Sequence, residues 1–151
     1  MTKTYTVTFA GHRKLLNHEE ISQQLETILR QVLCEHEYVE FLIGHDGDFD
    51  RLAASCVKRL QKDGYRSLCT LVLVLPYNKK DIVFFEKFYD EIEICEEASH
   101  AHFKAAITIR NRHMVDRCHL VVSYVKGNGG AQTTLHYAEK TGKTIINLAQ
   151  I

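Results

Sequence analysis

A glycine-rich segment in the last third of the chain contains the residue types best suited to hold a phosphate. It reads Gly127-Asn128-Gly129-Gly130-Ala131-Gln132-Thr133-Thr134 and follows an apolar, β-branched run at 120–124. Glycines let a backbone approach a phosphate closely, and threonine hydroxyls add hydrogen-bond donors. A helix that begins here would also direct free N–H groups and the positive end of its dipole at an anion. A tight turn with a threonine as the helix cap explains the same residues equally well.

Two further glycine turns also follow predicted strands. Gly11-His12-Arg13 comes directly after the strand-like run 4–10, and Gly44-His45-Asp46-Gly47 comes after the run 40–43. Turns that leave the carboxyl ends of parallel strands share one edge of the sheet, and open α/β sheets bind ligands at that edge. Arg13 is suited to clamp a phosphate there. Three such turns together predict a ligand site more strongly than any one of them.

Acidic residues surround the second glycine turn. Asp50 is suited to accept a hydrogen bond from a ribose hydroxyl, whereas Asp48 is suited equally to ligand contact and to capping the next helix. Segment 46–50 also resembles the start of a calcium-binding loop, but Arg51 and Val57 stand where an EF-hand needs glycine and glutamate. The histidines and cysteines are scattered along the chain, so we expect no metal site.

Arg110 is the second candidate for chemistry. On a helix it shares one stripe with Phe103, Ile107 and Met114, and this stripe is expected to face the core. An unpaired guanidinium is too costly in a core. Arg110 therefore either extends to the edge of the core or pairs with an anion, such as a ligand phosphate or the carboxylate of Asp116. The spacing leaves both interpretations open.

Strand-like and helix-like segments alternate along the whole chain, which predicts one α/β, Rossmann-like domain over 1–151. We expect a mostly parallel sheet with helices on both faces. The segment 77–99 has the weakest pattern, with a helical turn or two within 82–88 and a short edge strand at 92–94. The other predicted strands are 4–10, 40–43, 70–75, 120–124 and 144–148, and the predicted helices begin at Asn17 (with Glu20 as a capping-box partner), Asp48, about His100 and Thr134.

The composition excludes several classes of protein. Lys+Arg and Asp+Glu both number 19, so no net basic charge attracts nucleic acid. No apolar run approaches the roughly 20 residues that span a bilayer, and the N-terminus lacks a signal-peptide pattern. The cysteines are five in number and never in CxxC spacing, which is typical of reduced, mostly buried thiols. We therefore expect a cytoplasmic protein that does not enter a membrane.

These pieces together resemble the SLOG superfamily, a Rossmann-like group, and within it the bacterial YpsA-like branch. The resemblance covers nearly the whole chain and implies a nucleotide or a nucleotide-derived ligand, such as an ADP-ribose-like molecule, more firmly than it implies a reaction. The matching segments are 9–13, 44–54, 110–116 and 129–138. With the glycine turns, the resemblance predicts these ligand-binding residues: Gly11, His12, Arg13, Gly44, Gly47, Asp50, Arg110, Asn111, Gly129, Gly130, Thr133 and Thr134.

The LOG-type phosphoribohydrolases are the enzymes most useful for comparison, because they release a base from a nucleoside monophosphate. Their motif, Gly-Gly-x-Gly-Thr-x-Glu-Glu, follows a helix that carries a functional arginine and a methionine four residues later. Gln132 replaces the third glycine here, and Leu135 and His136 occupy the two glutamate positions. A leucine cannot stabilise cationic charge on the ribose. The positions that do match are Arg110, Met114, Gly129, Gly130 and Thr133.

Three functions follow as hypotheses. The first is binding of a nucleotide-type small molecule at the C-terminal edge of the sheet, for example by a sensor. The second is a nucleotide N-glycosidase whose acid comes from Asp46, Asp50 or Asp116. The third is binding of single-stranded nucleic acid, because the superfamily includes the Smf/DprA proteins, and the zero net charge makes this the least expected. Amphipathic helices leave room for a homo-oligomer without selecting one.

Overall fold

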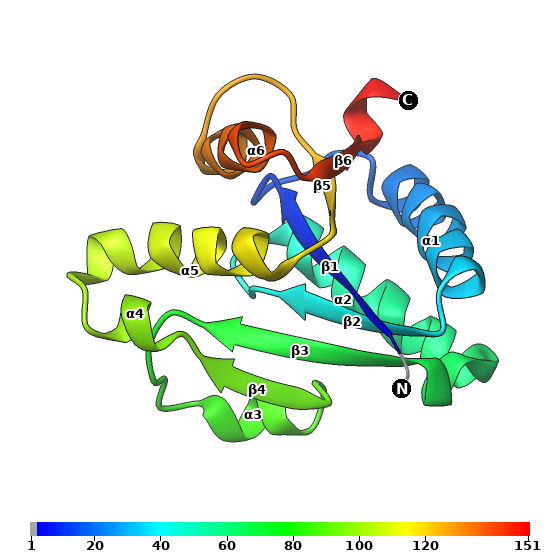
Figure 1. The fold of residues 1–151 in the computed structure, drawn as a ribbon, viewed down its shortest axis with the longest axis horizontal. Helices are drawn as coiled ribbons and strands as arrows, with labels where there is room; N and C mark the ends of the chain where they lie inside the picture. The colour runs from blue at the N-terminus through cyan, green and yellow to red at the C-terminus, as the bar shows by residue number, and fades with distance from the viewer. Residues whose placement is uncertain (1–2) are drawn as a thin grey trace.

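Within residues 3–151, which the computed structural model describes, six strands form one sheet in the order β4-β3-β2-β1-β5-β6 (Figure 1). Every neighbouring pair is parallel. The structure therefore confirms the predicted α/β class, with a sheet that is parallel throughout rather than mostly. The strands are β1 (Thr4–Gly11), β2 (Tyr38–Ile43), β3 (Cys69–Leu75), β4 (Glu91–Ile94), β5 (Leu120–Tyr124) and β6 (Thr144–Asn147).

Helices cover both faces of the sheet (Figure 1). On one face lie α1 (His18–Glu35), α2 (Asp48–Leu60) and the short α3 (Ile82–Glu86). On the other lie α4 (Glu96–Ser99), α5 (Phe103–Arg117) and α6 (Gly130–Lys140). None of these helices is long and apolar enough to cross a membrane.

The inner strand β3 shows why the sequence folds this way. Leu71, Leu73 and Leu75 are buried on the face that α1, α2 and α3 cover, while Val72 and Val74 are buried under α4 and α5. A strand covered on both faces needs an apolar residue at nearly every position rather than at alternate ones. The run TLVLVL meets this need, so it is stable only with a helical layer on each side.

The strand order reverses between β1 and β5. From β1 the chain places β2, β3 and β4 successively on one side, and then crosses to add β5 and β6 on the other side. The loops that leave β1 and β5 therefore run to opposite faces of the sheet. In open parallel sheets such a reversal opens a crevice at the carboxyl ends of the strands.

Several helix starts differ from the sequence prediction. Asn17 occupies the N-cap position of α1, but its side chain makes no capping hydrogen bond. The N-cap of α2 is Gly47 rather than Asp48. The final helix begins at Gly130, well before the predicted start at Thr134, with Gly129 as its N-cap. The interpretation of the glycine segment as a turn with a threonine cap is therefore wrong.

The less regular segment between β3 and α5 partly follows its prediction. The edge strand is present as β4, and α3 lies within the predicted 82–88 range. The helix predicted from about His100 is present as α5, which begins at Phe103, and the short α4 before it was not predicted. Cysteine burial was predicted correctly, since all five thiols are free and only Cys34 is exposed.

Gly11 allows the end of β1 to pack against the start of α2, which predicts a measurable cost for adding a side chain. A Cβ at Gly11 would overlap the Phe49 ring. Overpacking of this kind costs about 1–3 kcal/mol, so Gly11→Ala should lower the free energy of unfolding by that amount in urea titrations. Gly130→Ala is the matched control, because a Cβ there meets nothing within 4 Å. Equal stability of both variants would contradict this packing.

Candidate functional site

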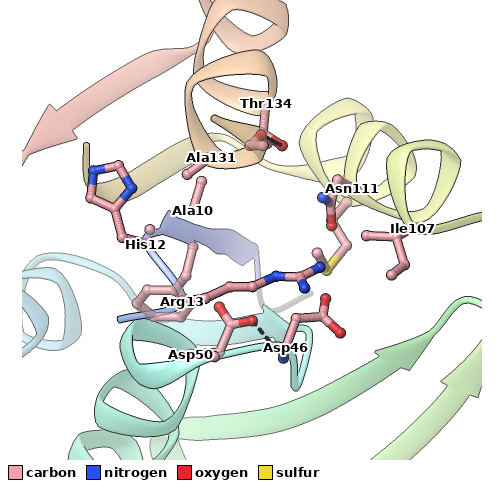
Figure 2. Close-up of a pocket in the computed structure, with 14 residues that line it drawn as sticks. Ala10, His12, Arg13, Asp46, Asp50, Ile107, Asn111, Ala131 and Thr134 are labelled. Atoms are coloured by element: carbon pink, nitrogen blue, oxygen red, sulfur yellow. Dashed lines mark hydrogen bonds between the residues drawn. The ribbon is translucent and has the colours of Figure 1, made fainter. Parts of the chain in front are cut away.

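A crevice of about 160 Å³ opens at the carboxyl edge of the sheet, beside the reversal between β1 and β5 (Figure 2). We refer to it as the switch-point crevice. The end of β1 and the loop after it form one side, and the starts of α2 and α6 and the middle of α5 form the others. Its lining residues are Phe9, Ala10, Gly11, His12, Arg13, Asp46, Gly47, Asp50, Ile107, Asn111, Met114, Gly130, Ala131 and Thr134.

The structure brings most of the predicted ligand-binding residues together. Thr133 lines an adjoining cavity rather than the crevice. Gly44, Arg110 and Gly129 line neither of these two cavities. Gly44 instead packs on the Arg110 guanidinium, where a Cβ would lie 3.0 Å from its central carbon. The predicted residues that do line the crevice are Gly11, His12, Arg13, Gly47, Asp50, Asn111, Gly130 and Thr134.

Arg110 is buried, and each of its three side-chain nitrogens donates a hydrogen bond to a protein group. Its side chain is 1% exposed. Nη1 donates to the Val74 carbonyl at 2.9 Å, Nε donates to Asn111 Oδ1 at 2.9 Å, and Nη2 donates to the Asp46 carboxylate. The anion that Arg110 requires is therefore Asp46. The alternative partner, Asp116, is not used, and its carboxylate instead accepts a 2.6 Å hydrogen bond from the Tyr137 hydroxyl.

The helical stripe around Arg110 faces the core only in part. Met114 is 3% exposed, whereas Phe103 is 64% exposed. The expectation that the whole stripe packs inward is therefore wrong at its first residue, which is also the first residue of α5. Ile107 lies between these two and lines the crevice. With Ala131, Ile107 and Met114 give one side of the crevice an apolar surface.

Asp50 is a carboxylate with an unusual environment. It lines the crevice, and its Oδ2 accepts the backbone N–H of Asp46 at 3.2 Å (Figure 2). Burial, reinforced by the neighbouring Asp46 carboxylate, raises the pKa of Asp50 to about 6, although Arg110 and Arg51 oppose the shift. At pH 7 Asp50 is mostly ionised and can accept hydrogen bonds from hydroxyl groups. Carboxylates kept in such surroundings cluster at functional sites.

Hydrogen bonds of Asp48 connect the loop after β1 to the start of α2. The backbone N–H of Asp48 donates to the Arg13 carbonyl at 2.9 Å, and its carboxylate accepts the Leu15 N–H at 3.0 Å. The same carboxylate lies 3.3 Å from His18 Nε2. Asp48 therefore neither caps its helix nor lines the crevice. It holds the backbone from which the Arg13 side chain extends.

A hydrogen bond to His12 connects the loop after β1 to the loop after β5, which leads into the glycine-rich segment. The Nε2 of His12 accepts the backbone N–H of Lys126 at 2.8 Å, which places the imidazole proton on Nδ1. Its ring also makes an edge contact with Tyr124 at the end of β5. His12 therefore links β1 to the loop that leads into Gly129 and Gly130. Its position indicates a role in orienting the glycine segment.

Arg13 and the start of α6 face each other across the crevice. Figure 2 shows the Arg13 side chain reaching across, with Asp46 and Asp50 on one side and Asn111 and Thr134 on the other. No carboxylate of residues 3–151 forms an ion pair with Arg13. Thr133 is the first residue of α6 whose backbone N–H donates within this turn, to the Gly129 carbonyl. The backbone N–H groups of residues 130–132 therefore remain available to a ligand.

One important residue was missing from the predicted set. Asp46 lines the crevice and neutralises Arg110, and its N–H orients Asp50. The available signal was its place next to Gly47 in the second glycine turn, combined with the requirement of Arg110 for an anion. Within residues 3–151, no group of three His, Cys, Asp or Glu side chains is arranged to hold a metal ion.

Comparison with known proteins supports the fold. No protein-family model and no curated protein matches the sequence. The structure is similar to DNA processing protein A from Helicobacter pylori, with a TM-score of 0.62 and 14% sequence identity, and that protein is described as having a unique single-stranded DNA binding mode. The match covers 93% of this chain but 63% of that one, so this chain spans less than two thirds of its length.

This similarity shows a shared fold and leaves function to be argued from the site. It agrees with the expected resemblance at the level of fold, since Smf/DprA proteins were among the proteins that the sequence resembles. The finer assignment to the YpsA-like branch stays a prediction.

The buried Arg110 predicts a large loss of stability when its charge is removed. Arg110→Met leaves the partly exposed Asp46 carboxylate and the Val74 carbonyl without their partner. We expect the free energy of unfolding to fall by about 3 kcal/mol, the lower end for a buried pair. Arg117→Met on the same helix is the control, because Arg117 is 30% exposed and its ion pairs are worth less than about 1 kcal/mol. Urea titration of both variants compares them directly.

The raised pKa of Asp50 predicts a pH-dependent gain in stability for Asp50→Asn. The folded protein binds the Asp50 proton more tightly than the unfolded chain does, because the pKa rises from 3.8 to about 6. Wild type should therefore lose stability as the pH rises from about 4 through 6, and the asparagine variant should not. At pH 8 we expect the variant to be more stable by roughly 1–3 kcal/mol.

Urea titrations at pH 4, 6 and 8 measure this difference. The exposed Asp81, whose side chain caps nothing, provides the control variant Asp81→Asn. A stability difference between Asp50→Asn and wild type that stays constant with pH would show that Asp50 has an ordinary pKa.

Proposed function

We propose that the switch-point crevice binds a nucleotide or a nucleotide-derived phosphorylated ligand. The observation that carries this proposal is the pairing, in one crevice, of an anion-accepting end with a hydroxyl-accepting end. Arg13 and the first N–H groups of α6 form the first, and Asp50 forms the second. A phosphorylated ribose presents the complementary groups, namely an anionic phosphate and neutral hydroxyl donors.

The crevice has a place for each part of such a ligand. The phosphate would lie over Gly130, where no side chain comes within 4 Å of the position a Cβ would take. Arg13 would contact the same phosphate, and Asp50 would accept a ribose hydroxyl. The apolar surface of Ile107, Met114 and Ala131 is suited to one face of a base.

Binding without LOG-type cleavage is the form of this proposal that the site supports. Leu135 is 5% exposed and packs in the core below α6. His136 is exposed, and its Nε2 lies 2.8 Å from Gln132 Nε2. Neither residue lines the crevice. The two positions that carry glutamates in the phosphoribohydrolases therefore supply no acid to the site, which is consistent with a sensor or a carrier of the ligand.

Single-stranded DNA is a weaker candidate for this crevice. The similarity in fold to DNA processing protein A favours this candidate, but at 14% identity that similarity shows the fold alone. The crevice places the carboxylates of Asp46 and Asp50 beside Arg13, and carboxylates repel a continuous run of phosphates. A short ligand with a single anionic end avoids this repulsion.

Thermal shift and calorimetry with the four ribonucleoside monophosphates, NAD and ADP-ribose test the proposal. A ligand that binds only the native state stabilises it by about 2.7 kcal/mol at 100 times its Kd, so at least one of these should raise the Tm by several degrees. Gly130→Asp, which adds a negative charge at the phosphate position, should abolish the shift while the variant remains folded. Lys62→Ala, at an exposed lysine in the segment 61–65 that follows α2, is the matched control.

Three outcomes decide the interpretation. A shift in wild type and Lys62→Ala that is lost in Gly130→Asp supports the crevice as the binding site. No shift with any compound rejects the proposal. Chromatography of the same samples reports whether free base accumulates. Base release that Asp50→Asn abolishes would assign N-glycosidic hydrolysis to this crevice instead, with Asp50 as the acid.

A further inference from the structure

A second cavity of about 240 Å³ adjoins the switch-point crevice. It lies between the exposed sides of α5 and α6, and we refer to it as the cationic cavity. The two spaces adjoin, because five of its lining residues also line the crevice: Arg13, Ile107, Asn111, Gly130 and Thr134. Its own residues are Lys104, Thr108, Arg112 and Thr133.

The two cavities differ in charge. Arg13, Lys104 and Arg112 line the cationic cavity, and no aspartate or glutamate does. The crevice, in contrast, contains the carboxylates of Asp46 and Asp50. Among residues 3–151 none of the three cations takes part in an ion pair. Three like charges around one small space repel one another, and an anion placed between them removes that repulsion.

Arg112 stacks on an aromatic ring, and its guanidinium donates no hydrogen bond to any of the residues 3–151 that the structure describes. Its guanidinium lies over the Tyr137 ring, 5.2 Å from the ring centroid. Tyr137 is itself fixed by the 2.6 Å hydrogen bond that its hydroxyl donates to Asp116. A guanidinium stacked in this way keeps its N–H groups free and loses little side-chain freedom when it binds an anion.

We propose that the ligand carries two linked phosphates and belongs to the class of nucleoside diphosphates. This inference rests on the proposed function and extends it. The first phosphate lies at Gly130 and Thr134, which line both spaces. The second phosphate occupies the cationic cavity beside Lys104 and Arg112. The ribose remains in the crevice at Asp50.

The order of charges along the joined spaces favours this class over others. Asp46 and Asp50 line only the crevice, and Lys104 and Arg112 line only the cationic cavity. The N-terminus of α6 lies between the two groups in this sense, because Gly130 and Thr134 line both spaces. A nucleoside monophosphate would leave Lys104 and Arg112 of the cationic cavity without an anion. A nucleic acid strand would instead have to continue past the Asp46 and Asp50 carboxylates.

Isothermal titration calorimetry of matched pairs of ligands tests the inference. The probes are AMP and ADP, GMP and GDP, CMP and CDP, and UMP and UDP, with phosphate and pyrophosphate as probes that lack a base. Wild type should bind at least one diphosphate about tenfold more tightly than its monophosphate, as expected for charge-assisted hydrogen bonds to an added phosphate. Lys104→Ala and Arg112→Gln should each remove most of this difference and leave monophosphate affinity within twofold.

Lys62→Ala is again the matched control and should change neither affinity. Melting curves confirm that each variant is folded, which is expected because Lys104 and Arg112 are both exposed. Equal affinity of wild type for monophosphate and diphosphate overturns the inference and leaves the proposed function intact. Failure of every probe to bind overturns both.

A single-stranded oligothymidylate added to the series separates the remaining possibility. If Lys104→Ala and Arg112→Gln weaken oligothymidylate binding in a salt-dependent way while diphosphates do not bind better than monophosphates, the cationic cavity is part of a nucleic acid track, and the inference is wrong. If diphosphates compete with the oligonucleotide and retain the tenfold preference over monophosphates, the assignment to nucleoside diphosphates holds.

Discussion

The buried guanidinium of Arg110 is the interaction on which the geometry of the site depends. It joins the Val74 carbonyl of β3, the Asp46 carboxylate after β2 and the neighbouring Asn111 of α5. These groups come from three separate parts of the chain, so one side chain sets the distance between the second glycine turn and α5. Gly44 leaves the room beside it, because a Cβ there would lie 3.0 Å from the central carbon of the guanidinium. The walls of the crevice are therefore positioned before any ligand enters.

The same pairing determines which charges remain available in the crevice. Because Arg110 takes Asp46, Arg13 has no internal carboxylate as an ion-pair partner among residues 3–151. Asp50 receives only a backbone N–H, and its burial raises its pKa to about 6. The buried carboxylate of Asp50 costs stability, whereas the Arg13 side chain is exposed and water solvates its charge. Proteins retain such groups where a ligand supplies the missing partner, which is the physical basis of the trade between stability and function.

Local patterns in the sequence predict the sheet and its common edge. They do not predict the hydrogen-bond partners of Arg110 and Asp48, which lie far away in the sequence. The apolar runs at β3 and β5 predict buried parallel strands, and the three glycine turns predict a common edge, because both features depend on neighbouring residues. The partner of Arg110 lies 64 positions away, and no local pattern distinguishes Asp46 from Asp116. Asp48 was misread for the same reason: its carboxylate is taken by Leu15 N–H, which belongs to a loop far away in sequence.

The overall charge of the chain and the local charge of its site lead to different conclusions. The protein has equal numbers of acidic and basic residues, so its net charge predicts no attraction to nucleic acid. Within the adjoining cavities, however, Asp46 and Asp50 line only the crevice, whereas Lys104 and Arg112 line only the cavity that no acid lines. This separation attracts a small ligand whose anionic part is short and lies at one end, and it works against a long polyanion. A fold shared with a single-stranded DNA-binding protein therefore does not determine the ligand, because the same sheet edge can carry either distribution of charge.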